Sequence, residues 1–277
     1  MKIVSAFCQS LFEEAFKSFD HIPFTFWGDN RPTDAQLEES RINVYWHSEP
    51  EEYFGSHSWI YENWKKFDMV LTWNPRDILN AVFCPFGTSP FHDRLGDLNT
   101  SLQQKDGWIS FIRGNKHFNV PGHHLRWELF DRRSEITSLP IDFHAQTTPA
   151  YASDVYEEAQ WFAQRRHIFG DNMFHIAIEN TSHDNYFTEK IIDCFIFRTV
   201  PIYFGCPNIN NFFNPRGIIT FNAVDELIGI CNGLSREDYI DRLSAVYENQ
   251  ARCMQYLHLG NTVARKLEAF FKFNGLL

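Results

Sequence analysis

The sequence predicts an α/β protein of two domains, each built on a parallel sheet. Short apolar runs typical of strands alternate with helical segments, and a polar stretch separates two halves that both alternate in this way. The chain has 277 residues, of which 44% are hydrophobic and 17% aromatic. This apolar content is enough for one large domain or two modest ones, and it argues against a disordered chain.

The first half begins with a strand predicted at Ile3–Phe7 and a helix at Gln9–Ser18. Further strands are predicted at Ile42–Trp46 and Met69–Trp73. The segment 97–107 is polar and ends in Asp-Gly, a pair that favours turns, so it is the predicted linker. We therefore expect an N-terminal domain over residues 1–104.

The pattern restarts after the linker, and the second domain is expected over residues 105–260. Trp108–Arg113 is a predicted buried strand, Gly114 its turn, and the segment from Leu125 to Arg132 the start of a helix. The remaining residues, 261–277, mix basic and aromatic side chains. We expect them to form a helix that packs back across the domains, with weak peripheral membrane contact as the alternative.

Charge and cysteine content limit the partners and the compartment. The formal net charge of −10 at pH 7 argues against nucleic acids and anionic membranes as partners, so any bound anion requires a local basic cluster. The six cysteines are scattered without a Cys-x-x-Cys pair, which is typical of free thiols in a reducing compartment. No apolar run approaches the ~20 residues of a membrane helix, and the N-terminus is too short in apolar length for a signal peptide. We expect a cytoplasmic protein.

The most informative stretch runs from Ile176 to Lys190, where an apolar strand changes abruptly into crowded polar side chains, Glu-Asn-Thr-Ser-His-Asp-Asn-Tyr-Phe-Thr-Glu-Lys. An apolar segment, Ile191–Phe197, and a strand-like run, Thr199–Gly205, follow directly. The order is therefore strand, loop, helix, strand. In an open α/β sheet such a loop lies at the carboxyl edge, where ligands bind.

The block from Glu179 to Pro215 contains Glu-Asn-Thr, Tyr-Phe-Thr-Glu-Lys, Val-Pro-Ile-Tyr-Phe-Gly and Phe-Phe-Asn-Pro in fixed order. It resembles the donor-binding signature of the α1,3-fucosyltransferase family. The resemblance implies the glycosyltransferase architecture called GT-B, in which two Rossmann-like α/β domains face a central cleft. It also implies an inverting transfer of fucose from GDP-fucose to a glycan hydroxyl.

Transfer from a nucleoside diphosphate requires positive charge where the diphosphate leaves. The sequence has no Asp-x-Asp metal motif, so we expect no metal and no cofactor, and cationic side chains must serve instead. Lys190, at a helix N-terminus, is the first predicted phosphate ligand. Arg126 is the second, because a guanidinium can bridge two phosphate oxygens and Leu125–Phe130 resembles the family's first donor-domain helix. Competitors of Arg126 are Arg113, Arg132 and Arg133.

The remaining polar residues of the motif are expected around the nucleotide and the sugar. Glu189 would be repelled by phosphate, so its natural partner is the ribose, as the resemblance also implies. The resemblance likewise places Glu179, Asn180 and Tyr186 at the donor. Thr188 is expected to cap the following helix through its hydroxyl, a contribution of about 1 kcal/mol. As ordinary alternatives, Tyr186 packs and Asn180 makes a turn.

The acceptor hydroxyl must lose a proton during attack, and a carboxylate is the usual base. Glu49 is the candidate, because it follows the strand Ile42–Trp46 and the resembling family keeps its catalytic glutamate after the same strand. Glu51 and Glu52 are neighbours that remain alternatives. A base on one face and the diphosphate on the other give in-line attack and inversion without a covalent intermediate.

Two other functions stay open from the sequence. One is a transferase of the same architecture that uses another nucleotide sugar, such as a xylosyl donor, because the motif specifies the diphosphate and ribose more firmly than the base or the sugar. The other is a carbohydrate-binding protein without catalysis, since a fold alone does not prove activity.

Overall fold

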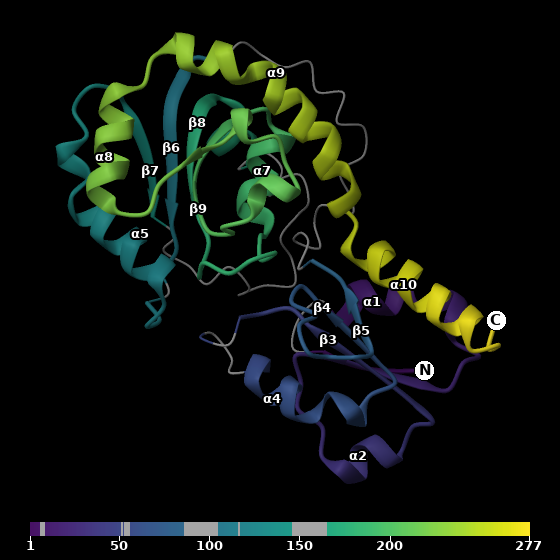
Figure 1. Cartoon of the computed structure of the whole chain (residues 1–277). Coiled ribbons are helices and arrows are strands. Elements are labelled where there is room, and N and C mark those ends of the chain that lie inside the picture. Colours follow the sequence, from purple (N-terminus) through teal and green to yellow (C-terminus); the bar gives the residue numbers. More distant parts are fainter. Residues whose placement is uncertain (6–8, 51, 53–55, 86–104, 116, 146–164) are drawn as a thin grey trace. The chain divides into compact units, whose positions relative to one another are not determined.

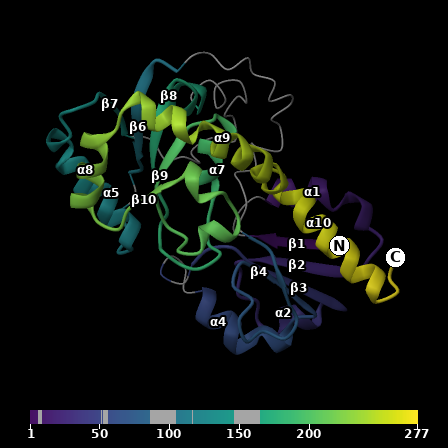
Figure 2. The same cartoon turned by 45° about the horizontal axis from the view of Figure 1, so that its top comes forward.

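The structure is a computed structural model that describes residues 1–5, 9–50, 52, 56–85, 105–115, 117–145 and 165–277 (Figures 1 and 2). The chain forms two compact units. The first comprises Met1–Asp93 together with Gln255–Leu277, and the second comprises Arg94–Met254. Most of the predicted linker, residues 97–104, lies outside the described residues.

The first unit contains a parallel five-stranded sheet whose strands follow one another in chain order. The predicted strands at 42–46 and 69–73 are present as β3 and β4, and β1 is the described part of the predicted strand at 3–7. The interior strand β2 was not predicted, although all five of its residues are buried like those of β3. The strands are β1 (Lys2–Ser5), β2 (Phe24–Gly28), β3 (Ile42–His47), β4 (Met69–Thr72) and β5 (Ala81–Phe83).

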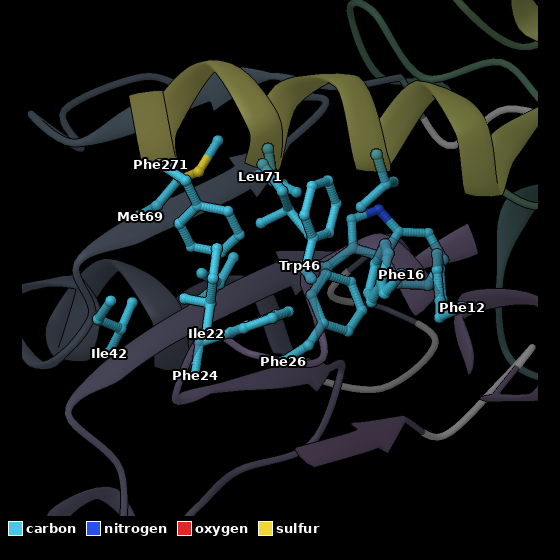
Figure 3. Close-up of a cluster of buried hydrophobic side chains, with 14 of the residues drawn as sticks. Phe12, Phe16, Ile22, Phe24, Phe26, Ile42, Trp46, Met69, Leu71 and Phe271 are labelled. Atoms are coloured by element: carbon cyan, nitrogen blue, oxygen red, sulfur yellow. The ribbon is translucent and has the colours of Figure 1, made fainter. Parts of the chain in front are cut away.

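Alternate residues of this sheet face two separate cores. Phe24 and Phe26 of β2 contribute to one core, whereas Trp27 contributes to the other. The first core is covered by α1 (Gln9–Ala15) and α10 (Leu259–Phe273), and Figure 3 shows Phe271 of α10 over the aromatic side chains of the sheet. The second core lies under α2 (Asp34–Glu38) and α4 (Ser56–Asn63).

The amphipathic helix α10 completes the first core. Its residues Val263, Leu267 and Phe271 are spaced by four, lie on one face and are fully buried. The ring centroid of Phe271 lies 5.1 Å from that of Phe24 and 5.5 Å from that of Phe19. The apolar face of this helix is therefore occupied by the first unit. No helix among the described residues combines the length and the apolar character that crossing a membrane requires.

The second unit also contains a parallel five-stranded sheet, in the order β10-β9-β8-β6-β7. The predicted strands at 108–113 and 199–205 are present as β6 and β9, and the apolar run before Glu179 is β8. The strands β7 and β10 were not predicted. The strands are β6 (Gly107–Arg113), β7 (Ile141–Ala145), β8 (Asn172–Ile178), β9 (Val200–Phe204) and β10 (Ile219–Thr220).

Helices cover both faces of this sheet (Figures 1 and 2). One pair of packed helices is α5 with α8, and the other is α7 with α9. The helix expected from Leu125 begins four residues earlier, where Pro121 occupies the first turn, a position that suits its fixed φ angle. The helix expected at 191–197 is α7. The bounds are α5 (Pro121–Asp131), α7 (Glu189–Ile196), α8 (Val224–Gly233) and α9 (Arg236–Cys253).

Shorter helical turns connect these elements. One π-helical turn, Arg166–Gly170, precedes β8. The 3-10 turns of the described chain are Lys17–Phe19, Trp64–Lys66, Arg133–Glu135, Ile209–Asn211, Pro215–Gly217 and Met254–Tyr256.

A buried lysine, Lys105, ties the entry of the second unit to its sheet. Its ammonium nitrogen donates to the carbonyl oxygens of Phe169, Gly170 and Asn172 at 2.8, 2.9 and 2.8 Å. It also donates to the hydroxyl of Thr199 at 2.9 Å. The side chain thereby joins the start of β6 to the segments that precede β8 and β9.

Candidate functional site

The strand order of the second unit reverses between β6 and β8. From β6 the chain continues to its neighbour β7, whereas from β8 it continues in the opposite direction to β9 and β10. At such a reversal the connections leave the carboxyl ends of two adjacent strands in opposite directions, and this is where open α/β sheets bind ligands. The predicted motif begins at the carboxyl end of β8 and therefore lies at the reversal.

Helix α5, which follows β6, approaches the end of β8 closely. The amide of Gly122 donates to the carbonyl oxygen of Asn180 at 2.9 Å. A β-carbon at Gly122 would lie 1.7 Å from the carbonyl oxygen of Glu179 and 2.9 Å from that of Asn180. Only glycine allows this approach. The first turn of α5 is thus fixed to the chain that leaves β8.

Arg126 lies one turn after Gly122 on the same side of α5. Its Nη2 donates to the carbonyl oxygen of Ile178 and, at 3.1 Å, to Oδ1 of Asn180. The side chain is 9% exposed. The fold therefore brings two predicted donor ligands, Arg126 and Asn180, into direct contact although 54 positions separate them in the sequence.

The three competing arginines are engaged elsewhere. The guanidinium of Arg113 lies over the rings of Trp127 and Phe130, 3.9 and 4.1 Å from their centroids. Arg133 also lies over Phe130, at 4.4 Å. Arg132 forms ion pairs with exposed carboxylates at distances of 2.6 to 3.0 Å, and its partners are Glu128, Glu135 and Asp225.

Glu179 is fully buried and connects the strand end to the next helix. Its carboxylate accepts hydrogen bonds from the amide and hydroxyl of Thr188 at 2.8 and 2.7 Å. Burial raises the pKa of Glu179, and the nearby ammonium of Lys190 opposes this rise. A β-carbon at Gly205 would lie 2.5 Å from Cγ of Glu179 and from the hydroxyl oxygen of Tyr203. Glu179 therefore holds the loop before α7 in place through its hydrogen bonds with Thr188.

Thr188 caps α7, as the sequence predicted, through a hydroxyl that accepts from the amide of Lys190. The ammonium of Lys190 lies 3.0 Å from that hydroxyl oxygen, 3.2 Å from Oε1 of Glu189 and 3.5 Å from Oε2 of Glu179. About a quarter of each side chain is exposed for Glu189 and Lys190. A cation thus lies at the N-terminus of α7, where the helix dipole adds to its charge.

Glu189 is ionised at neutral pH. Burial alone would raise its pKa, but the charges of Lys190 and Arg165 and the hydrogen bonds from Lys190 and Thr188 lower it to about 2. A carboxylate held in this form accepts hydrogen bonds and repels anions. The ionised carboxylate of Glu189 therefore suits a ligand that presents hydroxyl groups.

Tyr186 is 1% exposed, so its ring packs inside the second unit in this conformation. Within this unit the fold brings six of the seven predicted residues to one edge of the sheet. These are Arg126, Glu179, Asn180, Tyr186, Glu189 and Lys190.

Glu49 belongs to the first unit, where it follows β3 at the carboxyl edge of that sheet. Its side chain is partly exposed, and its amide donates to Oδ2 of Asp29 at 3.2 Å. Of its competitors, Glu52 is exposed and Glu51 lies outside the described residues. Asp29, which follows β2, was missed. The signal was the apolar run Phe24–Gly28, which ends in a polar Asp-Asn pair in the manner of a strand that leads to a site.

Arg165 was also missed. Its Nη1 lies 2.9 Å from Oδ2 of Asp193, a fully buried carboxylate of α7. Its charge also helps to lower the pKa of Glu189. The signal in the sequence was Asp193 itself, because a carboxylate inside an apolar helix needs a cation from elsewhere in the fold.

Comparison with known proteins gives a consistent result. Residues 137–259 match the family "Glycosyltransferase family 10 (fucosyltransferase) C-term". The chain is 30% identical over 176 residues to the alpha-(1,3)-fucosyltransferase FucT of Helicobacter pylori, which covers 61% of this chain and 33% of that protein. It is 33% identical over 90 residues to an alpha-(1,4)-fucosyltransferase of Arabidopsis thaliana, covering 31% of this chain and 22% of that protein. The chain thus spans about a third or less of these relatives.

Solved structures share the fold. A crystal structure of an alpha1,3-fucosyltransferase has a TM-score of 0.56 and 19% identity, covering 90% of this chain and 77% of that one. A structure of an alpha1,3-fucosyltransferase with GDP-fucose has a TM-score of 0.51 and 19% identity, covering 82% and 70%. TarM has a TM-score of 0.56 and 10% identity, covering 95% and 59%.

These matches agree with the two parallel α/β sheets of the structure, so the predicted fold class of the GT-B type is confirmed. The predicted resemblance to the α1,3-fucosyltransferases is confirmed as well. The second half of the chain is thus similar, over residues 137–259, to the C-terminal domain of glycosyltransferase family 10, the fucosyltransferases.

Proposed function

We propose that this protein is an inverting glycosyltransferase that moves L-fucose from GDP-fucose to a hydroxyl group of a glycan, without a metal ion. The observation that carries the proposal is the position of Lys190 and Arg126 at the strand reversal of the second unit. The related structure with GDP-fucose supports this choice of donor.

The diphosphate would be bound by two cations of different shape. Lys190 supplies a point charge at the N-terminus of α7, next to the amides of the first helical turn. Arg126 supplies a planar guanidinium that is held in place by Ile178 and Asn180, and such a fork matches two phosphate oxygens. Both groups would stabilise the charge that grows on the leaving diphosphate.

When the donor binds, Lys190 would gain the diphosphate as a partner. Before the donor binds, the ammonium of Lys190 is shared among Glu179, Glu189 and Thr188. A diphosphate at the N-terminus of α7 would offer the ammonium several anionic oxygens as further partners beside the carboxylates at 3.2 to 3.5 Å. Glu189 would then accept hydrogen bonds from the ribose hydroxyls.

Glu49 would act as the general base. It is a partly exposed carboxylate at the carboxyl edge of the first sheet, a position that suits contact with an acceptor. Removal of the acceptor proton by Glu49 and departure of the diphosphate would take place in a single displacement, which inverts the anomeric carbon. We also propose that the protein acts in the cytoplasm, because the five cysteines that the structure describes are buried free thiols.

The test is calorimetric titration with GDP and with UDP, in the presence of a chelator, on the wild type and on Lys190→Ala. We expect micromolar binding of GDP, weakened about 10- to 100-fold by the substitution, since a charge-assisted contact to phosphate contributes about 1.5–3 kcal/mol. Lys272→Ala is the matched control, because Lys272 forms an exposed pair with Glu268 and should leave binding unchanged.

Other outcomes would each change a specific part of the proposal. A preference for UDP would keep the architecture and overturn the fucosyl donor. Binding that required added magnesium or manganese would overturn the metal-free mechanism. Binding of neither nucleotide would favour a carbohydrate-binding protein without catalysis.

A further inference from the structure

Asp29 lies at the carboxyl end of β2, next to the strand that leads to Glu49. Its amide donates to the carbonyl oxygen of Trp46 in β3 at 2.9 Å. Its φ angle is 49°, in the left-handed region that residues other than glycine adopt rarely. Such strained residues are concentrated at functional sites, where the surrounding structure holds them.

The carboxylate of Asp29 binds the segment that carries Glu49. Its two oxygens accept from the amide of Ser48 at 3.1 and 3.2 Å, and Oδ2 also accepts from the hydroxyl of Ser48 and, at 3.2 Å, from the amide of Glu49. Ser48 is fully buried. One side chain thus engages two consecutive backbone amides and a hydroxyl at the point where the chain leaves β3.

The carboxyl group of Asp29 is buried, and this affects its ionisation. Burial raises its pKa to about 6, although the hydrogen bonds from Ser48 and Glu49 favour the ionised form. Tyr45 of β3 interacts electrostatically with Asp29 and with Arg31, and the amide of Glu49 donates to Asp29. The ionised carboxylate of Asp29 accepts hydrogen bonds from three donors, which are the amide and hydroxyl of Ser48 and the amide of Glu49. In the protonated form one of the two oxygens carries a hydrogen and becomes a donor.

We propose that Asp29 is the positioning residue for the base: its carboxylate holds the Ser48–Glu49 segment so that Glu49 is presented at the carboxyl edge of β2 and β3. This inference rests on the proposed function, in which Glu49 removes the acceptor proton. Asp29 itself touches neither donor nor acceptor in this scheme. It would contribute by fixing the position of the Glu49 side chain.

The proposal predicts a specific dependence of kcat on pH. As pH falls through about 6, Asp29 takes up a proton, the segment loses an acceptor, and kcat falls. The acidic limb of the wild-type profile should therefore lie near 6.

The test compares Asp29→Asn with Asp77→Asn and with Glu49→Gln, using the full chain with GDP-fucose and a glycan acceptor. Asp29→Asn keeps the shape but replaces one acceptor oxygen by a donor. We expect kcat to fall about 10- to 100-fold, as displacement of a reacting group does, with KM for the donor unchanged and the acidic limb near 6 lost. Asp77 is the matched control, because it is an exposed aspartate of the same unit with a φ angle of 58°.

A second variant, Ser48→Ala, removes only the hydroxyl. It should lower kcat about threefold to tenfold, the effect of one lost hydrogen bond, and move the acidic limb to higher pH, because the Ser48 hydroxyl favours the ionised form of Asp29. Melting temperatures of all variants identify any loss of folding.

Wild-type kcat in Asp29→Asn would overturn the inference, and so would a reduced kcat whose acidic limb still lies near 6, because that result indicates a purely structural role. Glu49→Gln separates this failure from failure of the proposed function. If Glu49→Gln abolishes transfer while Asp29→Asn behaves as wild type, the inference fails alone. If Glu49→Gln remains active, the proposed base is wrong and the inference falls with it.

Discussion

Replacing Lys105 by Met tests how a buried ammonium holds the second unit together. The two side chains have similar length, but Met has no N–H donor. The four oxygens that now accept from Lys105 belong to Phe169, Gly170, Asn172 and Thr199. The hydroxyl of Thr199 also donates to the carbonyl of Phe169 at 2.6 Å, so that carbonyl keeps a partner.

The magnitude follows from the oxygens that lose their donor. The carbonyls of Gly170 and Asn172 each lose a charge-assisted bond, and a buried acceptor left without a donor costs about 1–3 kcal/mol. Part of this is offset, because Met carries no charge whose burial must be compensated. We expect Lys105→Met to lower the free energy of unfolding by about 1–4 kcal/mol, the range left by these two opposing contributions.

The pH dependence gives a second measurement. Burial lowers the pKa of Lys105 from 10.5 to about 7. Between pH 7 and 10 the unfolded chain therefore binds a proton that the folded protein has released, so wild-type stability rises with pH in this window. Lys105→Met should lack this rise.

The assay is urea denaturation followed by tryptophan fluorescence at pH 7 and at pH 9. Lys2→Met is the control, since the side chain of Lys2 is 51% exposed and forms an ion pair with exposed Glu39. We expect this substitution to change the free energy of unfolding by less than about 0.5 kcal/mol. An unchanged unfolding midpoint in Lys105→Met at pH 7 would refute the reasoning.

Two further substitutions test the second sheet and its strand reversal. Burial lowers the pKa of His175, which bonds to Ser110 at 2.8 Å, to about 3, so stability should be lost as pH falls from 6.5 toward 3. His175→Gln should flatten this acid dependence in chemical denaturation, unlike a substitution of exposed His21; equal slopes would contradict the assignment. Gly122→Ala should cost about 1–3 kcal/mol and weaken GDP binding, because its β-carbon would meet the backbone of Glu179 at 1.7 Å. Gly229→Ala, which meets nothing within 4 Å, should be neutral or stabilising, and equal effects of the two would exclude the close approach.

The sequence was informative where a pattern is local. The strands β3, β4, β6 and β9 and the helix α7 have apolar runs with clear polar or glycine boundaries, and they were predicted within a few residues. The strand β2 was missed although its apolar run ends in a polar pair, whereas β5 and β10 have only three and two residues. Such strands exist because neighbouring strands pair with them, which is a property of the tertiary fold.

The candidate site shows the same division. Lys190, Glu189 and Asn180 lie in one contiguous motif, and the capping role of Thr188 follows from its position before an apolar helix. The contacts of Asp29 with Ser48 and of Arg165 with Asp193 join residues 19 and 28 positions apart through the folded chain. No local pattern specifies such partners, because a carboxylate can find its donors in any neighbouring element.

The first unit is discontinuous in sequence, and this has a consequence for the order of folding. Its core contains Phe12 and Phe24 near one end of the chain and Phe271 near the other (Figure 3). During synthesis, the whole second unit emerges from the ribosome before α10 does, so its sheet can close first. Until then only α1 covers the aromatic face of the first sheet, and contacts of very high sequence separation still have to form. The unit whose translation begins first is thus completed after the second unit, and the step that closes its core is the docking of α10.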